Sequence, residues 1–301
     1  MAQAGLCQAG EQARRAEGEG MGREPICRAQ EFQGQVEPMA WPRQQGVLKL
    51  NAPCWIAPAQ LRQQLAKAQD APVLLVDVRT HGWRADALEG AIALPLRDLP
   101  HQAFLAQGEA VLVGSGLDVA ELNQACLDLR RKGWRVKALR GGAPAWLEHR
   151  SGLAQAITAQ QWIMALGQGM DWHLALGAAL PDEQAERLPL EPALVLDAKA
   201  SASAQAVAGQ LLRLQQRLQR RASRQATQVA VVFLAQGDAS VVLQALHAAQ
   251  RQAPSPKAIA AATVPIYVVQ GGWDAYRAEV LQNHAIHATA QHALARACGA
   301  L

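Results

Sequence analysis

The sequence predicts an α/β protein made of two similar domains, each with a mostly parallel open sheet flanked by helices. Uninterrupted apolar runs of strand length, such as 73–78 and 229–234, are typical of strands buried on both faces of a parallel sheet. Segments with apolar residues at helical spacing alternate with these runs. A Gly-Gly pair also follows a strand in each half, at 141–142 and at 271–272. Two copies of one plan are the simplest account of these features.

The length of the chain fits two domains, and its charge does not indicate a nucleic-acid-binding protein. Its 301 residues are enough for two ordinary domains, and 50% of them are hydrophobic, so each domain has residues for a core. The abundance of Ala and the excess of Arg over Lys indicate a bacterial-type genome composition. The net charge of +4 is small, and no dense basic run with interleaved aromatic residues indicates a nucleic-acid partner.

The sequence gives no indication of a membrane segment. Its longest apolar runs, such as 229–235, are far too short to span a bilayer. Met1 is followed by a polar stretch rich in Gly and Gln instead of the apolar core of a signal peptide. We therefore expect a cytoplasmic protein without membrane contact.

The cysteines are odd in number and scattered, and no two of them form a CxxC pair. This pattern favours a reducing compartment over a disulfide framework or a zinc site. Cys126 lies on the apolar face of a predicted helix, where a packing role is expected. Cys54 comes directly before the first predicted helix, and we expect it to be exposed, which makes it the best spare thiol. The others are Cys7, Cys27 and Cys298.

The first part of the chain divides into an arm and a domain. Residues 1–45 are polar with little periodicity, and they predict a disordered arm. Residues 46–152 form the first predicted domain, in which strands alternate with helices that begin at Pro58 and near Val119. The expected strands are 73–78, 91–94, 110–113 and 135–139.

Residues 156–301 repeat this plan more loosely and add a C-terminal helical segment. Thr158 is placed to cap a helix that extends to Leu166. A long helix is indicated between 207 and 218, where apolar residues recur at helical spacing on one face. The expected strands are 172–176, 193–197, 229–234 and 266–269.

Three motifs of the first domain resemble those of the rhodanese family in order and in spacing. Val73–Arg79 resembles the opening strand with its Asp-Val-Arg signature, and Leu88–Pro95 resembles the second strand. Leu139–Trp146 resembles the closing Gly-Gly-x-x-x-Trp motif. The resemblance covers residues 55–150 well and 158–280 weakly. It implies a tandem of two rhodanese-like domains, a fold that serves sulfur transfer.

The resemblance also implies what the loop after the third expected strand, 110–113, should contain. In the family a cysteine stands there, three residues before a Gly and usually five before an Arg. The cysteine forms a thiolate that holds a persulfide sulfur. Backbone N–H groups of the loop form a nest for the negative charge, and the Arg adds a positive charge near the anionic substrate.

The loop of the first domain lacks these functional groups. Anchoring the motif on Gly116 places Val113 at the cysteine position and Asp118 at the Arg position. A shift by one residue places Gly114 at the cysteine position instead, and Ser115 matches a loop serine. A carboxylate at position 118 is expected to repel a thiosulfate-like anion.

The loop of the second domain shows the same loss. Anchoring on Gly237 places Leu234 at the cysteine position and Ala239 at the Arg position, with Ser240 as the trailing serine. Loss of both the nucleophile and the cation in both copies indicates that sulfur transfer is no longer the function.

We therefore expect a catalytically inactive pseudoenzyme with a binding, regulatory or scaffolding role and an unidentified protein partner. No cofactor and no metal are expected, and weak binding of a small anion is expected at residues 114–118. One alternative is a sulfurtransferase of the thiosulfate or mercaptopyruvate type that uses a displaced cysteine, Cys54. Another is a structural subunit of a larger assembly, held through the N-terminal arm or an Arg-rich helix over 213–224.

Three further groups of residues have a functional and an ordinary interpretation. Ser115 has no identifiable base to activate it as a nucleophile, so a role in the turn is favoured. The histidines 284, 287 and 292 have helical spacing, but no acidic or Cys ligand completes a metal site. The arginines of 213–224 are interpreted as a solvated helix face, with a docking surface for an acidic partner as the alternative.

Overall fold

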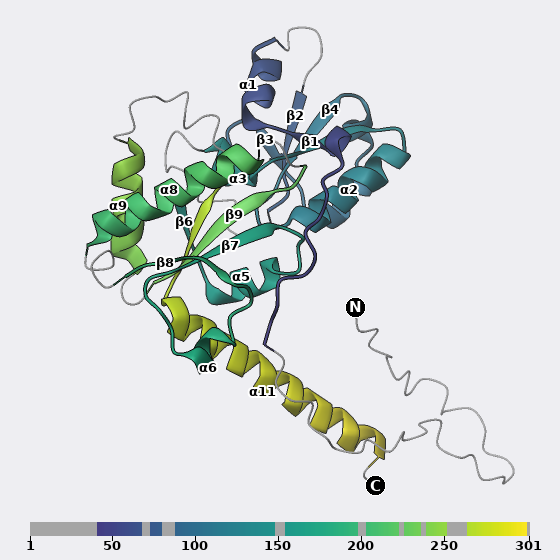
Figure 1. Ribbon diagram of the computed structural model, residues 1–301. Coiled ribbons are helices and arrows are strands. Elements are labelled where there is room, and N and C mark those ends of the chain that lie inside the picture. The colour runs from purple at the N-terminus through teal and green to yellow at the C-terminus, as the bar shows by residue number, and fades with distance from the viewer. Residues whose placement is uncertain are drawn as a thin grey trace, which may run out of the picture. The chain divides into compact units, whose positions relative to one another are not determined.

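The computed structural model describes residues 41–67, 73–79, 88–147, 154–197, 203–222, 226–235, 239–251 and 264–299. One compact unit, Pro38–Ala285, contains two five-stranded sheets. Strands of both sheets are labelled in Figure 1. Residues 1–40 of the predicted arm lie outside the described residues.

The first sheet has the strand order β1-β5-β4-β2-β3, and every neighbouring pair is parallel. Its strands are β1 Trp55–Ile56, β2 Val73–Asp77, β3 Ala91–Ala93, β4 Glu109–Val113 and β5 Arg135–Leu139. The helices of this domain are η1 Ala52–Cys54, α1 Pro58–Lys67, η2 Leu96–His101, η3 Ala103–Ala106, α2 Val119–Arg131 and α3 Gly142–Trp146.

The second sheet has the order β6-β10-β9-β7-β8, again with parallel pairs throughout. Its strands are β6 Ala154–Ile157, β7 Asp171–Leu176, β8 Pro192–Val195, β9 Val229–Leu234 and β10 Ile266–Val269. Its helices are α5 Ala159–Ala165, α6 Asp182–Ala185, α8 Ala204–Ala222, α9 Ala239–Arg251 and α11 Gly272–Gly299. Strand for strand, this order repeats that of the first sheet, so the predicted fold class is confirmed.

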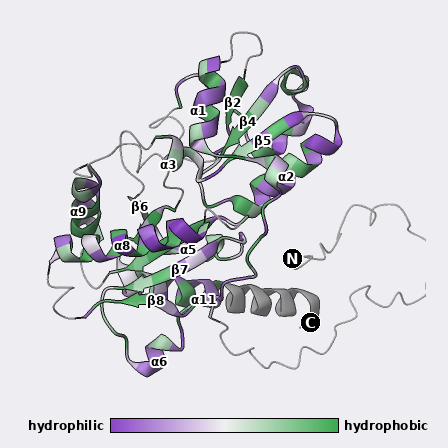
Figure 2. Ribbon diagram, turned by 45° about the horizontal axis from the view of Figure 1, so that its top comes forward, coloured by the Kyte–Doolittle hydropathy of each residue, from purple (hydrophilic) through white to green (hydrophobic). Residues whose placement is uncertain are grey.

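The predicted strands with long apolar runs are present, because such runs are buried on both faces. Every residue of β9 and of β10 is buried. On α8 the residues Val207, Leu211, Leu214 and Leu218 form a buried face, as their spacing predicts. Figure 2 shows hydrophilic and hydrophobic residues mixed along this helix. The capping box predicted at the start of α5 is also present, between Thr158 and Gln161.

Sequence reasoning missed the first strand of each sheet. The strand β1 has only two residues, and β6 has the weakly apolar sequence Ala-Gln-Ala-Ile. Both lie at a sheet edge and pair on one side only. A strand this short contributes too few apolar residues for a periodic signal.

The segment 41–50 packs on the second domain, although sequence reasoning assigned residues 41–45 to a disordered arm. Trp41 stacks on Trp273 with ring centroids 6.4 Å apart, and Arg187 lies 5.5 Å from the Trp41 ring. In Figure 1 this purple segment runs from β1 along the second domain. Its backbone N–H groups donate from Gln44 to Pro189, from Gln45 to Leu166, from Leu48 to Gly169 and from Leu50 to Ala226.

Within the described ranges, no helix is both long enough and apolar enough to cross a membrane.

Candidate functional site

The loop between β4 and α2 lies where the family motif places the reactive cysteine. It covers residues 114–118, after Val113 at the end of β4 and before Val119 at the start of α2. In the register of the sheet, Asp77 at the end of β2 is the partner of Val113. The loop is therefore at the carboxyl end of a parallel sheet, where such folds commonly place their ligands.

No reactive side chain stands at the junction of strand and loop. The side chain of Val113 is fully buried in the core, together with Val111 and Leu139. Gly114 is buried as well. Both residues that the two motif registers place at the cysteine position are thus inside the protein and carry no nucleophilic atom.

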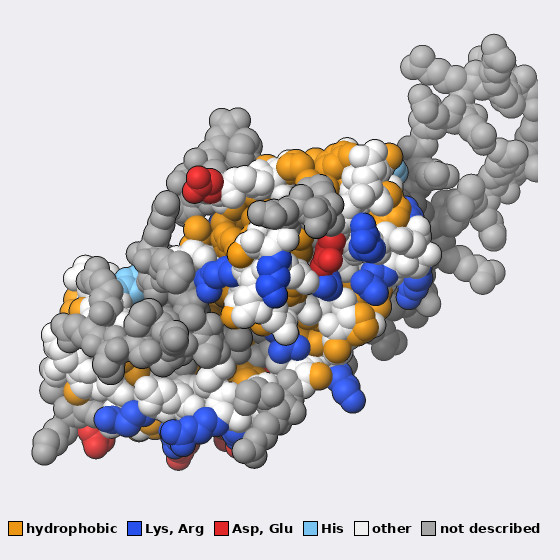
Figure 3. Space-filling model, turned by 90° about the horizontal axis from the view of Figure 1, so that it is seen from above, with side chains coloured by type: hydrophobic (Ala, Val, Ile, Leu, Met, Phe, Trp, Pro, Cys, Tyr) orange, Lys and Arg blue, Asp and Glu red, His pale blue; other side chains and the backbone are white. Residues whose placement is uncertain are grey.

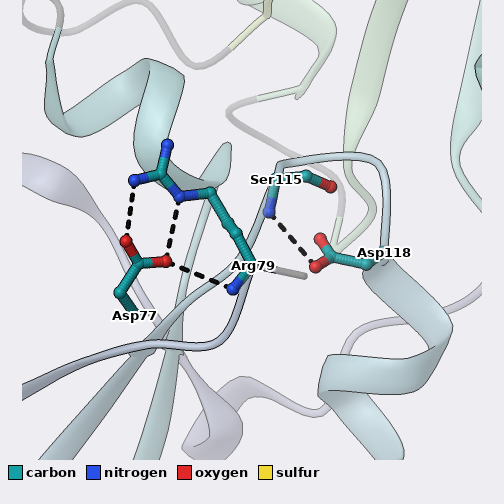
Figure 4. A network of polar contacts seen from close by, with 4 residues as sticks. All are labelled: Asp77, Arg79, Ser115 and Asp118. Carbon is teal, nitrogen blue, oxygen red and sulfur yellow. Dashed lines mark hydrogen bonds and ion pairs between the residues drawn. The ribbon is translucent and has the colours of Figure 1, made fainter. Parts of the chain in front are cut away.

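Asp118 folds back onto the loop and occupies its anion nest. One carboxylate oxygen accepts the N–H of Ser115 at 3.1 Å, and the other accepts the N–H of Gly116 at 3.2 Å. Figure 4 shows the carboxylate of Asp118 directed at Ser115. We expected this carboxylate to repel an external anion beside the nest; in the structure the carboxylate is itself the anion in the nest.

Burial raises the pKa of Asp118, and the hydrogen bonds from Ser115 and Gly116 lower it in part. The carboxylate also restricts its neighbour. A Cβ atom at Gly114 would lie 2.6 Å from Oδ1 of Asp118 and closer still to Oδ2. While Asp118 holds this position, only glycine fits at position 114. A cysteine at position 114 is therefore incompatible with this placement of Asp118.

Ser115 closes the turn, the role that its sequence favours. Its hydroxyl oxygen accepts the N–H of Leu117 at 3.1 Å. With the two bonds to Asp118, the N–H groups of three successive loop residues are donated within the loop. The prediction of weak anion binding at 114–118 is not supported by this arrangement, because these three donors already have acceptors.

The Asp-Val-Arg signature forms a tight ion pair beside the loop. Nε of Arg79 donates to Oδ1 of Asp77 at 2.9 Å, and a terminal nitrogen donates to Oδ2 at 2.7 Å. The backbone N–H of Arg79 also donates to this carboxylate at 3.2 Å. The two side chains are only 13% and 4% exposed, and Figure 4 shows the bidentate pair. Arg79 is thereby oriented by Asp77, which gives the signature a structural role next to the loop.

The Gly-Gly motifs bring a second backbone segment against each loop. Gly142 has φ +59°, and a Cβ atom there would lie 2.9 Å from Cα of Gly116 and closer to its nitrogen. The N–H of Ala143 donates to the carbonyl of Gly114 at 2.8 Å. Gly272 has φ +55° and makes the equivalent close approach to Ala235 in the second domain. Only glycine fits such an approach with positive φ.

The second loop is described only in part. Leu234 is buried at the end of β9, so the predicted cysteine position again carries a core side chain. Gly237 lies outside the described residues. Ala239 is buried as the first residue of α9, and Ser240 is exposed beside it.

The prediction of an exposed spare thiol at Cys54 is wrong. Cys54 is 0% exposed and forms a disulfide with Cys126, which is also fully buried, with their Cα atoms 5.8 Å apart. The argument against disulfides also fails for this pair, since an odd cysteine count says nothing about which two lie close in space. The buried packing position of Cys126 is confirmed.

The remaining candidates belong to the helices α8 and α11. His284 lies on α11, whereas the side chains of His287 and His292 are outside the described part of that helix. Among the described residues, no three His, Cys, Asp or Glu side chains gather as metal ligands. Arg213, Arg217 and Arg221 are exposed on α8.

Sequence reasoning missed two residues of the second domain that reach the first loop. Gln228 hydrogen-bonds to Gly116 and to Gly141, and the buried hydroxyl of Tyr267 faces Gly116. In the sequence, the features that could have pointed to them are the polar residue directly before the apolar strand β9 and the tyrosine within the apolar strand β10.

Comparisons with known proteins find similar solved structures only. No protein-family model matches, and no curated protein matches. A rhodanese-related protein from Thermoplasma volcanium is 18% identical, with 32% of this chain and 93% of that chain covered and a TM-score of 0.27. A protein from Anabaena sp. is 27% identical, covering 32% and 78%, with a TM-score of 0.27. Thiosulfate sulfurtransferase from Pseudomonas aeruginosa is 13% identical, covering 73% and 41%, with a TM-score of 0.24.

Two of the motifs that carry the family resemblance lie beside the loop 114–118 in the structure. Asp77 and Arg79 pair at the end of a central strand, the loop 114–118 follows the neighbouring strand, and the Gly-Gly pair closes against that loop. The second sheet repeats the strand order and its own Gly-Gly pair. The described structure thus has two domains of the same parallel α/β fold, as the resemblance of the sequence implies.

Proposed function

We propose that this chain is a catalytically inactive tandem rhodanese-like protein with a binding or scaffolding role. The observation that carries the proposal is the position of Asp118. Its carboxylate accepts the N–H groups of Ser115 and Gly116, the donors that would stabilise a persulfide or its anionic substrate. The loop thus holds a negative charge of its own, and a second anion there would meet both repulsion and occupied donors.

Sulfur transfer also requires a thiolate that the substrate can reach. A thiolate forms where positive charge or N–H donors lower the pKa of an accessible cysteine. At the cysteine position the first loop has Val113 or Gly114, and the second domain has Leu234 at the end of β9. None of these residues has a sulfur atom to carry through a transfer.

A displaced cysteine is a poor substitute. Cys54 and Cys126 are both 0% exposed, and their sulfur atoms are bonded to each other. Neither sulfur is free to attack a sulfane donor such as thiosulfate. This burial weighs against the alternative of an active sulfurtransferase that uses Cys54.

One surface supports the binding role. The helix α8 exposes Arg213, Arg217 and Arg221 and contains no acidic residue. Figure 3 shows more Lys and Arg than Asp and Glu on the face it presents, in agreement with the net charge of +4. An acidic protein surface is the partner whose charge complements this helix.

The proposal is tested by an assay of sulfur transfer. The full chain is incubated with thiosulfate or mercaptopyruvate and cyanide, and thiocyanate and the intact mass are measured. A sulfurtransferase with an intact loop cysteine is run alongside as the positive control. We expect no thiocyanate above the enzyme-free rate and no mass gain of one sulfur. Turnover by the wild-type chain that is lost in Cys54→Ala would establish the displaced-cysteine alternative and refute the proposal.

A further inference from the structure

The first loop is contacted by a side-chain amide of the second domain. Gln228 is the last residue before β9 and is only 5% exposed. Its Nε2 donates to the carbonyl of Gly116 at 3.1 Å, and its Oε1 accepts the N–H of Gly141 at 3.5 Å. One amide thus contacts both backbone segments that form the site, the loop and the Gly-Gly motif.

A second side chain of the same domain lies under the loop. Tyr267 on β10 is 0% exposed, and its ring lies 5.5 Å from that of Trp172. A Cβ atom at Gly116 would lie 3.1 Å from the Tyr267 hydroxyl, so this hydroxyl faces the loop. Burial and the negative charge of Asp118 raise the pKa of Tyr267, which keeps its hydroxyl protonated. This hydroxyl makes no hydrogen bond to the described residues, so it can act on Asp118 only through its dipole.

Apolar packing joins the two domains around these polar contacts. Val119 and Leu122, in the first turn of α2, belong to the same buried cluster as Trp172 and Tyr267 of the second domain. One buried apolar core therefore extends from the start of α2 to the second sheet. Gln228 supplies hydrogen-bond partners to the buried backbone groups of Gly116 and Gly141 at this place.

We propose that the loop 114–118 has become the attachment point of the second domain, whose Gln228 binds it as a resident ligand and whose Tyr267 hydroxyl faces it. An amide suits the position because it offers one donor to the Gly116 carbonyl and one acceptor to the Gly141 N–H. Asp118 fixes the turn so that the Gly116 carbonyl points at Gln228. This inference rests on the proposed function, since a loop held by the second domain is not also an open active site.

The amide contact is tested by Gln228→Met, a change of similar shape without hydrogen bonds. The matched control is Gln215→Met, because Gln215 is equally buried but donates to Val264 within the second domain. Hydrogen exchange of peptides covering 114–118 and 138–143 is measured by mass spectrometry. We expect exchange in these first-domain peptides to rise about tenfold in Gln228→Met, as for a lost buried hydrogen bond, and to stay unchanged in Gln215→Met.

An unchanged exchange rate in Gln228→Met, or the same rise in both variants, would refute the attachment. The thiocyanate assay is independent of this result, because a chain without turnover can still fail the exchange test. The two proposals are therefore separately falsifiable.

The role of Tyr267 is tested by combining Tyr267→Phe with Asp118→Asn. If the hydroxyl stabilises the carboxylate, Tyr267→Phe lowers the melting temperature in the wild-type background and has less effect when residue 118 is neutral. An equal effect in both backgrounds would show that the hydroxyl and the carboxylate are uncoupled and would remove Tyr267 from the proposal. This cycle tests the part of the proposal that concerns Tyr267, and it does not depend on the folding of Gln228→Met.

Discussion

The carboxylate of Asp118 receives the N–H of Gly116 at 3.2 Å, and through this bond a residue from the start of a helix determines the shape of the loop that precedes it. In the family pattern that position holds an arginine, which faces the substrate. Here the charge is reversed and the side chain turns inward. The N–H donors of the loop serve an internal acceptor.

The first prediction concerns the overlap of Gly114 with Asp118. Gly114→Ala alone forces its Cβ against the Asp118 carboxylate, and we expect it to lower the free energy of unfolding by about 1–3 kcal/mol. Asp118→Ala alone leaves two N–H groups unpaired at a comparable cost. The double variant removes the overlap, so its loss should be smaller than the sum of the two. Urea unfolding of the wild type, the two single variants and the double variant gives the four free energies of unfolding. If the losses of the single variants simply add up in the double variant, residues 114 and 118 are not in contact.

The second prediction is a pH dependence from Asp118. Burial raises its folded-state pKa above the ordinary value of 3.8, so the folded chain binds this proton more tightly than the unfolded chain does. The resulting stability is present below pH 3.8 and is lost as the pH rises through the folded pKa. The free energy of unfolding of the wild type relative to Asp118→Asn should therefore fall over this range and then level off. A difference that rises over the same range would contradict the burial of the carboxylate.

The third prediction contrasts two glycines. Gly142 has positive φ and touches the loop, so Gly142→Ala should destabilise the protein by about 2–4 kcal/mol. Gly209 lies within α8 with nothing within 4 Å of an added Cβ, so Gly209→Ala should stabilise by about 0.5–1 kcal/mol through helix propensity. Thermal unfolding of the two variants should shift in opposite directions. A shift in the same direction for both would indicate that the close approach at Gly142 is absent.

The fourth prediction concerns the Cys54–Cys126 disulfide. The intact mass of the protein purified without reductant should be lower by two hydrogens than after denaturation and reduction. Cys54→Ser should lower stability by about 4 kcal/mol, as the chain-entropy model gives for a sequence separation of 72. Cys298→Ser serves as the control for loss of a cysteine outside the pair. Alkylation of Cys54 in the native, unreduced protein would contradict both the bond and the burial of its sulfur.

Much of the fold was predictable because its signal is local. The apolar runs of β2, β4 and β9 are long enough to identify strands buried on both faces, and the alternating helices then fix the class. The absence of a loop cysteine was equally local, since it needs only the residues at 113 and 114.

The internal contacts of the site were not predictable in this way. Asp118 directly precedes α2, where an aspartate usually caps the helix, but here it makes no capping bond and turns back to the loop. Gln228 and Cys54 have partners that are far away in the sequence. No local pattern reports such pairs, because they depend on how the two domains and the helix α2 pack.

The contact of Trp41 with Trp273 also constrains the order in which the protein assembles during synthesis. The segment 41–50 leaves the ribosome early, yet its aromatic neighbours Trp273 and Tyr276 are translated only after both sheets. The packing of Trp41 therefore has to wait until nearly all of the second domain has been synthesised, so the segment that precedes the first domain is among the last to be placed.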